Sequence, residues 1–145
     1  MARKTILVVD DEPRIRSLVK SVLGRRRHRI LEASDGVEAV AVFERKGVKI
    51  DLILTDIVMP RMDGIELAER ASSQAPKVRV IYMSGKCEAE AVRRDVDAKG
   101  FGFVRKPFDI GELDRKVNQF LAKPAARTKG AGAEPRPERA VRISP

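Results

Sequence analysis

The segment DLILTDIVMP, residues 51–60, decides the fold of this chain. It holds a short apolar run that stops at Asp56, and a second run, ILVV at residues 6–9, stops at Asp10 and Asp11. Such runs are typical of buried central strands in a parallel sheet, and these sheets bind ligands beyond the carboxyl ends of their strands. Two such strands side by side bring three carboxylates together. Because crowded like charges are unfavourable without a cation or a bound proton, the pattern predicts a divalent metal site.

Five repeats of a strand followed by a helix account for residues 1–121. The pattern predicts strands near Thr5–Val9, Arg29–Ala33, Leu52–Thr55, Val78–Met83 and Phe101–Val104. It predicts helices that open at Pro13, after Asp35, near Gly64–Gln74, near Glu88–Ala98 and after Asp109. Strands that alternate with helices indicate a parallel sheet with helices on both faces.

The apolar spacing of the helices predicts which side of each helix faces the core. The expected inner residues are Ile15, Leu18, Val19, Val22 and Leu23 in the first helix, Val37, Val40 and Ala41 in the second, Ala91, Val92 and Val96 in the fourth, and Leu113, Val117, Phe120 and Leu121 in the fifth. Asp35 and Asp109 are each followed by a glutamate three residues later, which resembles a capping box and predicts the start of the second and fifth helices.

The composition of the strands predicts their order in the sheet. The first, third and fourth strands are the most apolar and suit the centre, whereas the charged second strand and the glycine-broken fifth strand suit the edges. The expected fold is therefore an α/β, doubly wound (βα)5 three-layer sandwich of the flavodoxin-like type, with the parallel order 2-1-3-4-5. The three aspartates then lie at the switch point between the first and third strands, where a ligand site is expected.

The bulk composition suits one intracellular domain. The chain has 145 residues, 43% of them hydrophobic, and no apolar run approaches the ~20 residues of a membrane span. No signal peptide is expected, because the first apolar run is short and leads into acidic residues. Cys87 is the one cysteine, which excludes an internal disulfide and fits a reducing compartment. We expect a cytoplasmic protein without membrane contact.

A basic tail follows the predicted domain. We expect a domain over residues 1–122 and a Pro/Ala/Gly-rich tail over residues 123–145, which holds six basic and two acidic side chains and so carries +4 of the total charge of +9. This composition cannot bury a core and predicts disorder.

The chemistry of the site favours phosphoryl transfer over nucleotide binding. No glycine-rich loop follows the first strand, and the carboxylates there repel phosphate groups. Hard oxygen ligands suit Mg²⁺. A metal beside an ionised aspartate, which needs no general base, supports covalent phosphorylation of that carboxylate. Ser84 ends the fourth strand and can donate to a phosphoryl oxygen, and Lys106 follows the fifth strand and can supply a positive charge.

Four segments together resemble the receiver domain of bacterial two-component response regulators. They are ILVVDDEP at residues 6–13, DLILTDIVMPRMDG at residues 51–64, MSG at residues 83–85 and RKPF at residues 105–108. The resemblance spans about residues 4–121. It implies a phospho-acceptor that receives a phosphoryl group from a sensor histidine kinase or a histidine phosphotransfer protein in a Mg²⁺-dependent reaction.

The resemblance also implies a role for each motif residue. Asp56 is the implied acceptor. Asp11, Asp56 and the backbone carbonyl of Val58 are the implied Mg²⁺ ligands, with Asp10 acting mostly through water. Ser84 and Lys106 are the implied phosphoryl-binding residues, Ser84 and Phe103 the implied switch residues, and the Lys106–Pro107 bond the implied cis peptide.

The implied output is a protein contact. Phosphorylation would shift a two-state equilibrium and change the face formed by the fourth helix, the fifth strand and the fifth helix. The protein is then not an enzyme acting on other substrates, but a signalling phospho-acceptor that catalyses its own phosphorylation and dephosphorylation.

Two residues predict the lifetime of the phosphorylated state. Val58 stands two residues after Asp56, where its side chain borders the attacking water and cannot orient it. Lys86 stands two residues after Ser84 and can pair with the phosphoryl group. These residues together predict a long-lived phosphorylated state.

Several residues have simpler interpretations. Asp11 could cap the first helix, and Phe103, which alternates with Phe101, could be a core residue. Ser84 could be an ordinary turn residue, because Ser-Gly is a common turn pair. We expect His28, which lies among arginines, to be a surface residue and not a phosphorelay histidine, and Cys87 to be a loop thiol.

The function also has alternatives. The domain could be a stand-alone receiver, a relay intermediate, a phosphate sink or the receiver module of a hybrid kinase, although Met1 directly before the first strand favours a complete chain. The tail and the arginines of residues 25–29 could bind nucleic acid or an acidic partner, but the tail has no aromatic residue for stacking. A phosphohydrolase is disfavoured, because it would need an acid at the position of Val58.

Overall fold

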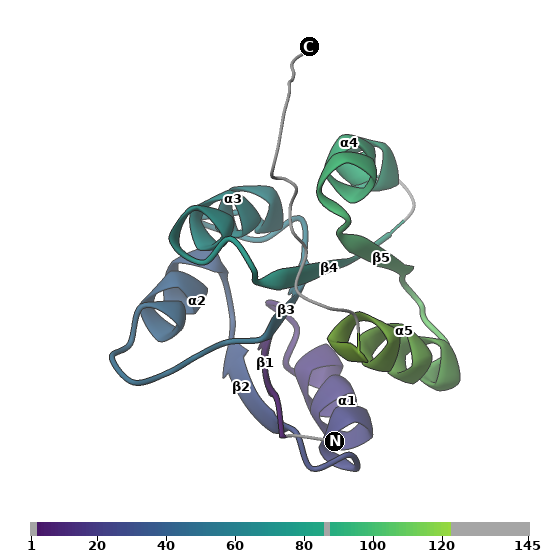
Figure 1. Cartoon of the computed structure of the whole chain (residues 1–145). Helices are drawn as coiled ribbons and strands as arrows, with labels where there is room; N and C mark the ends of the chain where they lie inside the picture. Colours follow the sequence, from purple (N-terminus) through teal and green to yellow (C-terminus); the bar gives the residue numbers. More distant parts are fainter. Residues whose placement is uncertain (1–2, 86–87, 123–145) are drawn as a thin grey trace.

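The structure, a computed structural model, describes residues 3–85 and 88–122 as a single five-stranded sheet between two layers of helices (Figure 1). The strands are β1 (Thr5–Val9), β2 (Arg29–Ala33), β3 (Leu52–Asp56), β4 (Arg79–Ser84) and β5 (Gly102–Arg105). The helices are α1 (Pro13–Gly24), α2 (Gly36–Phe43), α3 (Gly64–Gln74), α4 (Ala89–Lys99) and α5 (Ile110–Ala122). All strand pairs are parallel and the order is β2-β1-β3-β4-β5, so the predicted fold class and strand order are confirmed.

Two apolar clusters, one on each face of the sheet, hold the three layers together. Alternate residues of every strand point to opposite faces. Leu7 and Ile53 pack with α2, α3 and α4, whereas Ile6 and Leu54 pack with α1 and α5. Figure 1 shows α1 and α5 side by side on their face of the sheet. This sandwich buries the three central strands on both faces, as their continuous apolar runs predict.

The strand register brings the predicted site residues to one edge of the sheet. Val9 lies beside Thr55, so Asp10 and Asp56 are the next residues on neighbouring strands. Asp56 lies beside Met83, the residue before Ser84. Because parallel strands share their direction, the ends of β1, β3, β4 and β5 all meet at this edge.

The inner face predicted for α2 is wrong at Val37 and Ala41, whereas Val40 packs against the core as predicted. Val37 and Ala41 are exposed and Val40 is half-buried, and the residues that α2 buries are instead Gly36, Ala39 and Val42. The reason is a close backbone contact: a Cβ on Gly36 would lie 2.6 Å from the carbonyl oxygen of Met62. The start of α2 therefore sits against the loop before α3, and this contact fixes the rotation of the helix.

Three further positions differ from the sequence prediction. Leu18 and Ala91, which were expected on inner faces, are exposed. His28 is buried and not a surface residue, because it lies beneath the start of β1, where its Nδ1 accepts a bond of 3.4 Å from the backbone N–H of Lys4. The contact joins residues 24 positions apart, so the local arginine-rich sequence could not predict it.

An ion pair ties the β3–α3 loop to the first turn of α2. Asp35 caps α2 by accepting from the backbone N–H of Glu38 at 2.8 Å, as predicted, and its other oxygen accepts from Nε and Nη2 of Arg61 at 2.8 and 2.6 Å. These bonds lower the pKa of Asp35, the backbone bond most. Arg61 has a φ of 69°, an uncommon value for a non-glycine residue, so the ion pair holds an unusual backbone turn in place.

Asp35→Asn is expected to remove stability at neutral pH but not in acid. Asn still caps the helix, so the change isolates the charge. Because folding lowers the pKa of Asp35, its charge contributes stability above the unfolded pKa of about 3.9, and this contribution is lost as the pH falls through the lower folded value. Chemical denaturation at pH 7 and at pH 3 should show a difference from wild type that shrinks in acid. The exposed Asp97→Asn is the control, and an equal effect of both variants would refute the assignment.

Some predictions fall outside the described residues. These are the lifetime role of Lys86, the loop position of Cys87 and the tail of residues 123–145. In the part of the chain that the structure describes, no helix has both the length and the apolar character needed to span a membrane.

Candidate functional site

Three carboxylates meet at the ends of β1 and β3, as the sequence predicts. One oxygen from each of Asp10, Asp11 and Asp56 lies within 4.8 Å of the others. Asp10 and Asp56 are buried, whereas Asp11 is exposed. The site is therefore an acidic pocket with two carboxylates in its floor and one at its solvent side.

Asp10 is fixed by the backbone on both sides of it. Its N–H donates to the carbonyl of Ala33 at 3.2 Å, and its Oδ1 accepts from the N–H of Glu12 at 2.9 Å. Its carbonyl accepts from Nη1 of Arg16 at 2.6 Å, and the Nε of Arg16 also bonds Glu32 at 3.3 Å. These contacts leave the Oδ2 of Asp10 to face the centre of the site.

Asp56 ends β3 in an equally constrained position. Its Oδ1 accepts from the N–H of Ile57 at 2.8 Å, and its carbonyl accepts from the hydroxyl of Thr55 at 2.8 Å. The chain then turns back, so that the N–H of Gly64 donates to the carbonyl of Ile57 at 2.8 Å. A Cβ on Gly64 would lie 2.1 Å from the carbonyl oxygen of Asp56, closer than any real contact, so this position requires glycine.

Gly64→Ala is expected to displace Asp56 and to destabilise the fold. The added methyl group has no room beside the Asp56 carbonyl, and overpacking of this kind costs on the order of 1–3 kcal/mol. Gly24→Ala is the matched control, because no atom lies within 4 Å of a Cβ at that position. Thermal unfolding and Mg²⁺ titration should show losses for Gly64→Ala alone, and wild-type values for both variants would contradict the argument.

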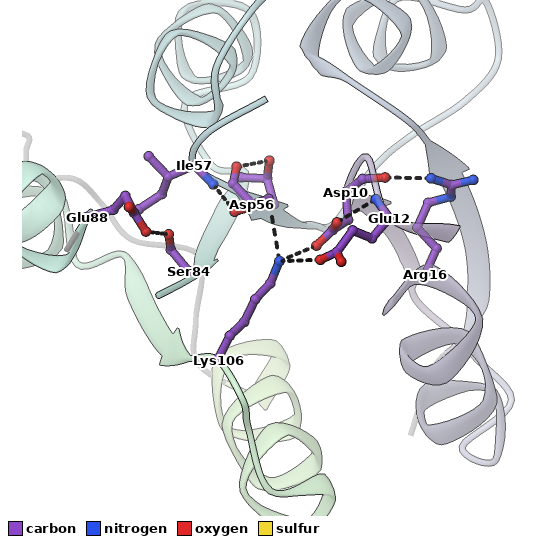
Figure 2. A network of polar contacts seen from close by, with 9 residues as sticks. Asp10, Glu12, Arg16, Asp56, Ile57, Ser84, Glu88 and Lys106 are labelled. Atoms are coloured by element: carbon purple, nitrogen blue, oxygen red, sulfur yellow. Dashed lines mark hydrogen bonds and ion pairs between the residues drawn. The ribbon is translucent and has the colours of Figure 1, made fainter. Parts of the chain in front are cut away.

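Lys106 joins the two buried carboxylates (Figure 2). It follows β5, and its backbone N–H donates to the carbonyl of Ser84 at 2.8 Å, which aims its side chain across the site. Its Nζ lies 2.7 Å from Asp10 Oδ2, 3.2 Å from Asp56 Oδ2 and 3.9 Å from Glu12 Oε1. The Lys106–Pro107 bond is cis. The predicted lysine thus reaches the predicted acceptor across 50 residues of sequence.

The electrostatics of the site follow from this crowding. Burial raises the pKa of Asp56, and the negative charge of Asp10 adds to the effect while Lys106 opposes it. For Lys106, burial lowers the pKa, but the hydrogen bonds and charges of Asp10 and Asp56 together raise it above its ordinary value. The acidic pocket therefore favours cations, and Lys106 supplies one positive charge to it.

Oxygen donors make up the candidate metal site. The carboxylates of Asp10, Asp11 and Asp56 suit a hard divalent cation such as Mg²⁺. Among residues 3–85 and 88–122, no hydrogen bond or ion pair engages the Asp11 side chain, which leaves its oxygens free for a metal. Asp11 does not cap α1, since Glu12 occupies the N-cap position. The carbonyl of Val58 as a ligand stays a prediction.

Ser84 lies at the expected strand end but bonds an unexpected partner. It is the last residue of β4, is buried, and donates its hydroxyl to the carboxylate of Glu88 (Figure 2). Sequence reasoning missed Glu88, and it also missed Arg16 and Glu12 as neighbours of the site. The one signal in the sequence for the Ser84–Glu88 pair is the glutamate four residues after Ser84. This spacing alone does not show that the two side chains meet, because the path of the chain between them depends on the fold.

Phe103 has a core contact, which its alternation with Phe101 predicted. It lies beside Tyr82 in the sheet, is half-buried, and packs on the cluster beneath α2, α3 and α4. Phe101 meets the ring of Tyr82 edge-on, with 6.1 Å between centroids. A switch role for Phe103 stays a prediction.

Known proteins that are similar to this chain differ in length, so the chain spans a different share of each one. The chain is 37% identical over 120 residues to the sensor kinase CckA of Brucella abortus, and the match covers 82% of this chain but 13% of the kinase. It is 31% identical over 121 residues to the sporulation initiation phosphotransferase F of Bacillus subtilis, with 83% of this chain and 96% of that protein covered. Several transcriptional regulators match over about half their length, such as 48% for the transcriptional regulatory protein ResD of Bacillus subtilis.

A solved structure and a family model both match this chain to receiver domains. The receiver domain of NtrX from Brucella abortus superposes with a TM-score of 0.74 at 30% identity, with 82% of this chain and 99% of that domain covered. The family model of the response regulator receiver domain matches residues 6–118, which include the five strands except Thr5, the first residue of β1, and all residues of the acidic pocket. The chain belongs to the response regulator receiver domain family.

Proposed function

We propose that the protein is a phospho-acceptor that receives a phosphoryl group on Asp56 and thereby switches a protein-binding surface. The observation that carries the proposal is the joint placement of Asp56, two further carboxylates and Lys106 at one sheet edge. An isolated acidic cluster would bind a cation, but the partly buried Lys106 adds a group that pairs with a phosphoryl oxygen. Together they suit an anionic group attached to a carboxylate.

The chemical step is a transfer between two nucleophiles. An oxygen of the Asp56 carboxylate attacks the phosphorus of a phosphohistidine, so that a P–O bond forms while the P–N bond breaks and the imidazole of the donor leaves. Asp56 needs no general base, since it reacts as a carboxylate. Lys106 and the hydroxyl of Ser84 would hold the phosphoryl oxygens. Bound Mg²⁺, held by Asp11, Asp56 and the backbone carbonyl of Val58, with Asp10 acting mostly through water, would neutralise charge on the phosphoryl group.

The proposed donors and outputs are proteins. The donor is a sensor histidine kinase or a histidine phosphotransfer protein, as the family membership and the names of two relatives suggest. The output is a contact made by the face of α4, β5 and α5. In this proposal the protein catalyses its own phosphorylation and dephosphorylation and acts on no separate substrate.

Intact-mass measurement with a small phosphodonor tests the proposal. The wild-type chain should gain the mass of one phosphoryl group in Mg²⁺, and a chelator should prevent the gain. No gain under any Mg²⁺ concentration would refute the function.

The lengths of the relatives favour three settings for this switch. The coverage of nearly all of the sporulation phosphotransferase suits a relay protein, and the similarity to one segment of a sensor kinase suits a hybrid-kinase receiver or a phosphate sink. Transfer from purified phosphotransfer proteins would separate a relay protein from a phosphate sink, because a relay protein passes the group onward to a second histidine, whereas a sink loses it to water.

The phosphorylated state is expected to be long-lived, and Val58→Asn is expected to shorten it. Val58 is 62% exposed in the β3–α3 loop, and its side chain offers no hydrogen bond to an attacking water. An amide at this position can orient that water. Loss of phosphate from purified phosphorylated protein should accelerate several-fold in Val58→Asn, whereas Val37→Asn, the same change at an exposed position on α2, should leave the rate unchanged. Rapid loss in the wild type that Val58→Asn does not alter would rule out this role.

A further inference from the structure

Helix α4 is held to the sheet by few apolar contacts. Val92 is the one fully buried residue in its eleven, and Val96 adds a partly buried side chain. By comparison, α5 buries four apolar residues in thirteen. A helix with so little apolar burial depends on polar contacts for its position, and such an element is easily shifted by a ligand.

Two hydroxyl–carboxylate contacts join α4 to β4. Near the middle of the helix, the buried hydroxyl of Tyr82 lies 3.3 Å from Asp95, which Lys99 also approaches at 3.5 Å. At the start of the helix, Ser84 donates to Glu88. The first contact lies away from the acidic pocket, but the second uses the hydroxyl that is proposed to bind the phosphoryl group. The Ser84 hydroxyl therefore both holds the first turn of α4 in position and takes part in the proposed chemistry of the site.

Glu88 directs its side chain away from its own helix. It occupies the N-cap position of α4 but makes no side-chain bond to the first turn, because its carboxylate accepts from Ser84. A serine hydroxyl has a single proton to donate. While that proton is directed to Glu88, it cannot be donated to a phosphoryl oxygen on Asp56.

We infer that Glu88 competes with the phosphoryl group for the Ser84 hydroxyl, so that occupation of Asp56 releases the first turn of α4. This inference rests on the proposed function and makes Glu88 a positioning residue that acts through Ser84. The released carboxylate has a second favourable place beside the free N–H groups of its own helix start. The Glu88 carboxylate thus has a hydrogen-bond donor in both arrangements, either the Ser84 hydroxyl or the N–H groups at the start of α4. Two such alternatives are what a two-state element requires. By linkage, Glu88 weakens phosphoryl binding by the same factor by which that binding weakens the contact.

Calorimetric titration with beryllofluoride, a phosphoryl mimic, in Mg²⁺ tests the competition on the full chain. Glu88→Ala should bind the mimic roughly three- to tenfold more tightly than wild type, the range expected for one hydrogen bond. Glu88→Gln, which keeps an acceptor without the charge, should fall between them. Glu90→Ala is the matched control, because Glu90 lies in the same turn with its side chain 80% exposed and its removal changes the net charge equally.

A double-mutant cycle separates the contact from a general charge effect. In a Ser84→Ala background, Glu88→Ala should no longer change the affinity, because no hydroxyl remains to be shared. Hydrogen exchange supplies a readout of the helix: the amides of residues 89–92 should exchange faster in wild type when the mimic is bound, and fast at all times in Glu88→Ala. An equal gain in affinity with and without Ser84, or no gain at all, would overturn the inference.

Different results would refute the proposed phospho-acceptor function and the role of Glu88. If the mimic does not bind, or binds Asp56→Asn as well as wild type, then the proposed function is wrong and the role of Glu88 falls with it. If binding depends on Asp56 and Glu88→Ala matches Glu90→Ala, then the role of Glu88 alone is wrong.

Discussion

Asp56→Asn is expected to gain no mass from a small phosphodonor in Mg²⁺, whereas the wild-type chain gains one phosphoryl group. The amide of asparagine is not a nucleophile towards phosphorus, so the loss should be essentially complete. The remaining carboxylates do not replace the acceptor, because Asp10 is held by Glu12 and Lys106 and Asp11 lies at the solvent side of the pocket.

The same variant is expected to be more stable than wild type without metal. Burial and the charge of Asp10 raise the pKa of Asp56, which means that folding disfavours its charged form. The neutral amide removes this unfavourable charge. Thermal unfolding in a chelator should therefore show a higher midpoint for Asp56→Asn, and the difference should shrink as Mg²⁺ is added, because Mg²⁺ stabilises the wild-type fold by binding to it. A persistent mass gain in the variant would move the acceptor to another residue.

Lys106→Met is expected to cause the largest loss of stability of any single change at the site. Asp10 is fully buried, and in the described part of the chain Lys106 is the side chain that forms an ion pair with it. Breaking a buried ion pair leaves an uncompensated charge and costs on the order of 3–5 kcal/mol. Methionine keeps the length of the apolar stem, so the effect reports the charge. Urea denaturation in a chelator measures it.

Mg²⁺ and a surface control distinguish the loss of the Lys106 charge at the site from a general effect of removing a lysine. A divalent cation can neutralise the same carboxylates, so the destabilisation of Lys106→Met should decrease as Mg²⁺ rises. Lys20→Met removes an equal charge from a surface pair with Glu32, in which the lysine side chain is 58% exposed, and should cost less than about 1 kcal/mol. Equal effects of the two variants, or a loss that ignores Mg²⁺, would contradict the electrostatic account.

The sequence predicted the sheet and the floor of the site because both depend on local pattern. Short apolar runs identify strands, and the direction of parallel strands brings the residues after them to one edge. The amino-acid pattern alone therefore predicts that Asp10, Asp56, Ser84 and Lys106 lie together.

Two of the errors concern contacts between distant segments. The rotation of α2 is set by the close approach of Gly36 to Met62, and the burial of His28 by the backbone of Lys4. Neither contact leaves a periodic signal in the chain. The pairing of Ser84 with Glu88 escaped prediction because it joins a strand end to the turn before a helix, where neither the strand period nor the helix period applies.

Identification of the phosphorylated residue is the decisive test that Asp56 is the phospho-acceptor. Borohydride reduces an acyl phosphate, so phosphodonor-treated protein can be reduced, digested and mapped by mass spectrometry. We expect one reduced aspartate, Asp56, in a Mg²⁺-dependent reaction that a chelator abolishes. Modification at any other residue, or at Asp56 without a metal requirement, would contradict the assignment of the acceptor and the acidic pocket.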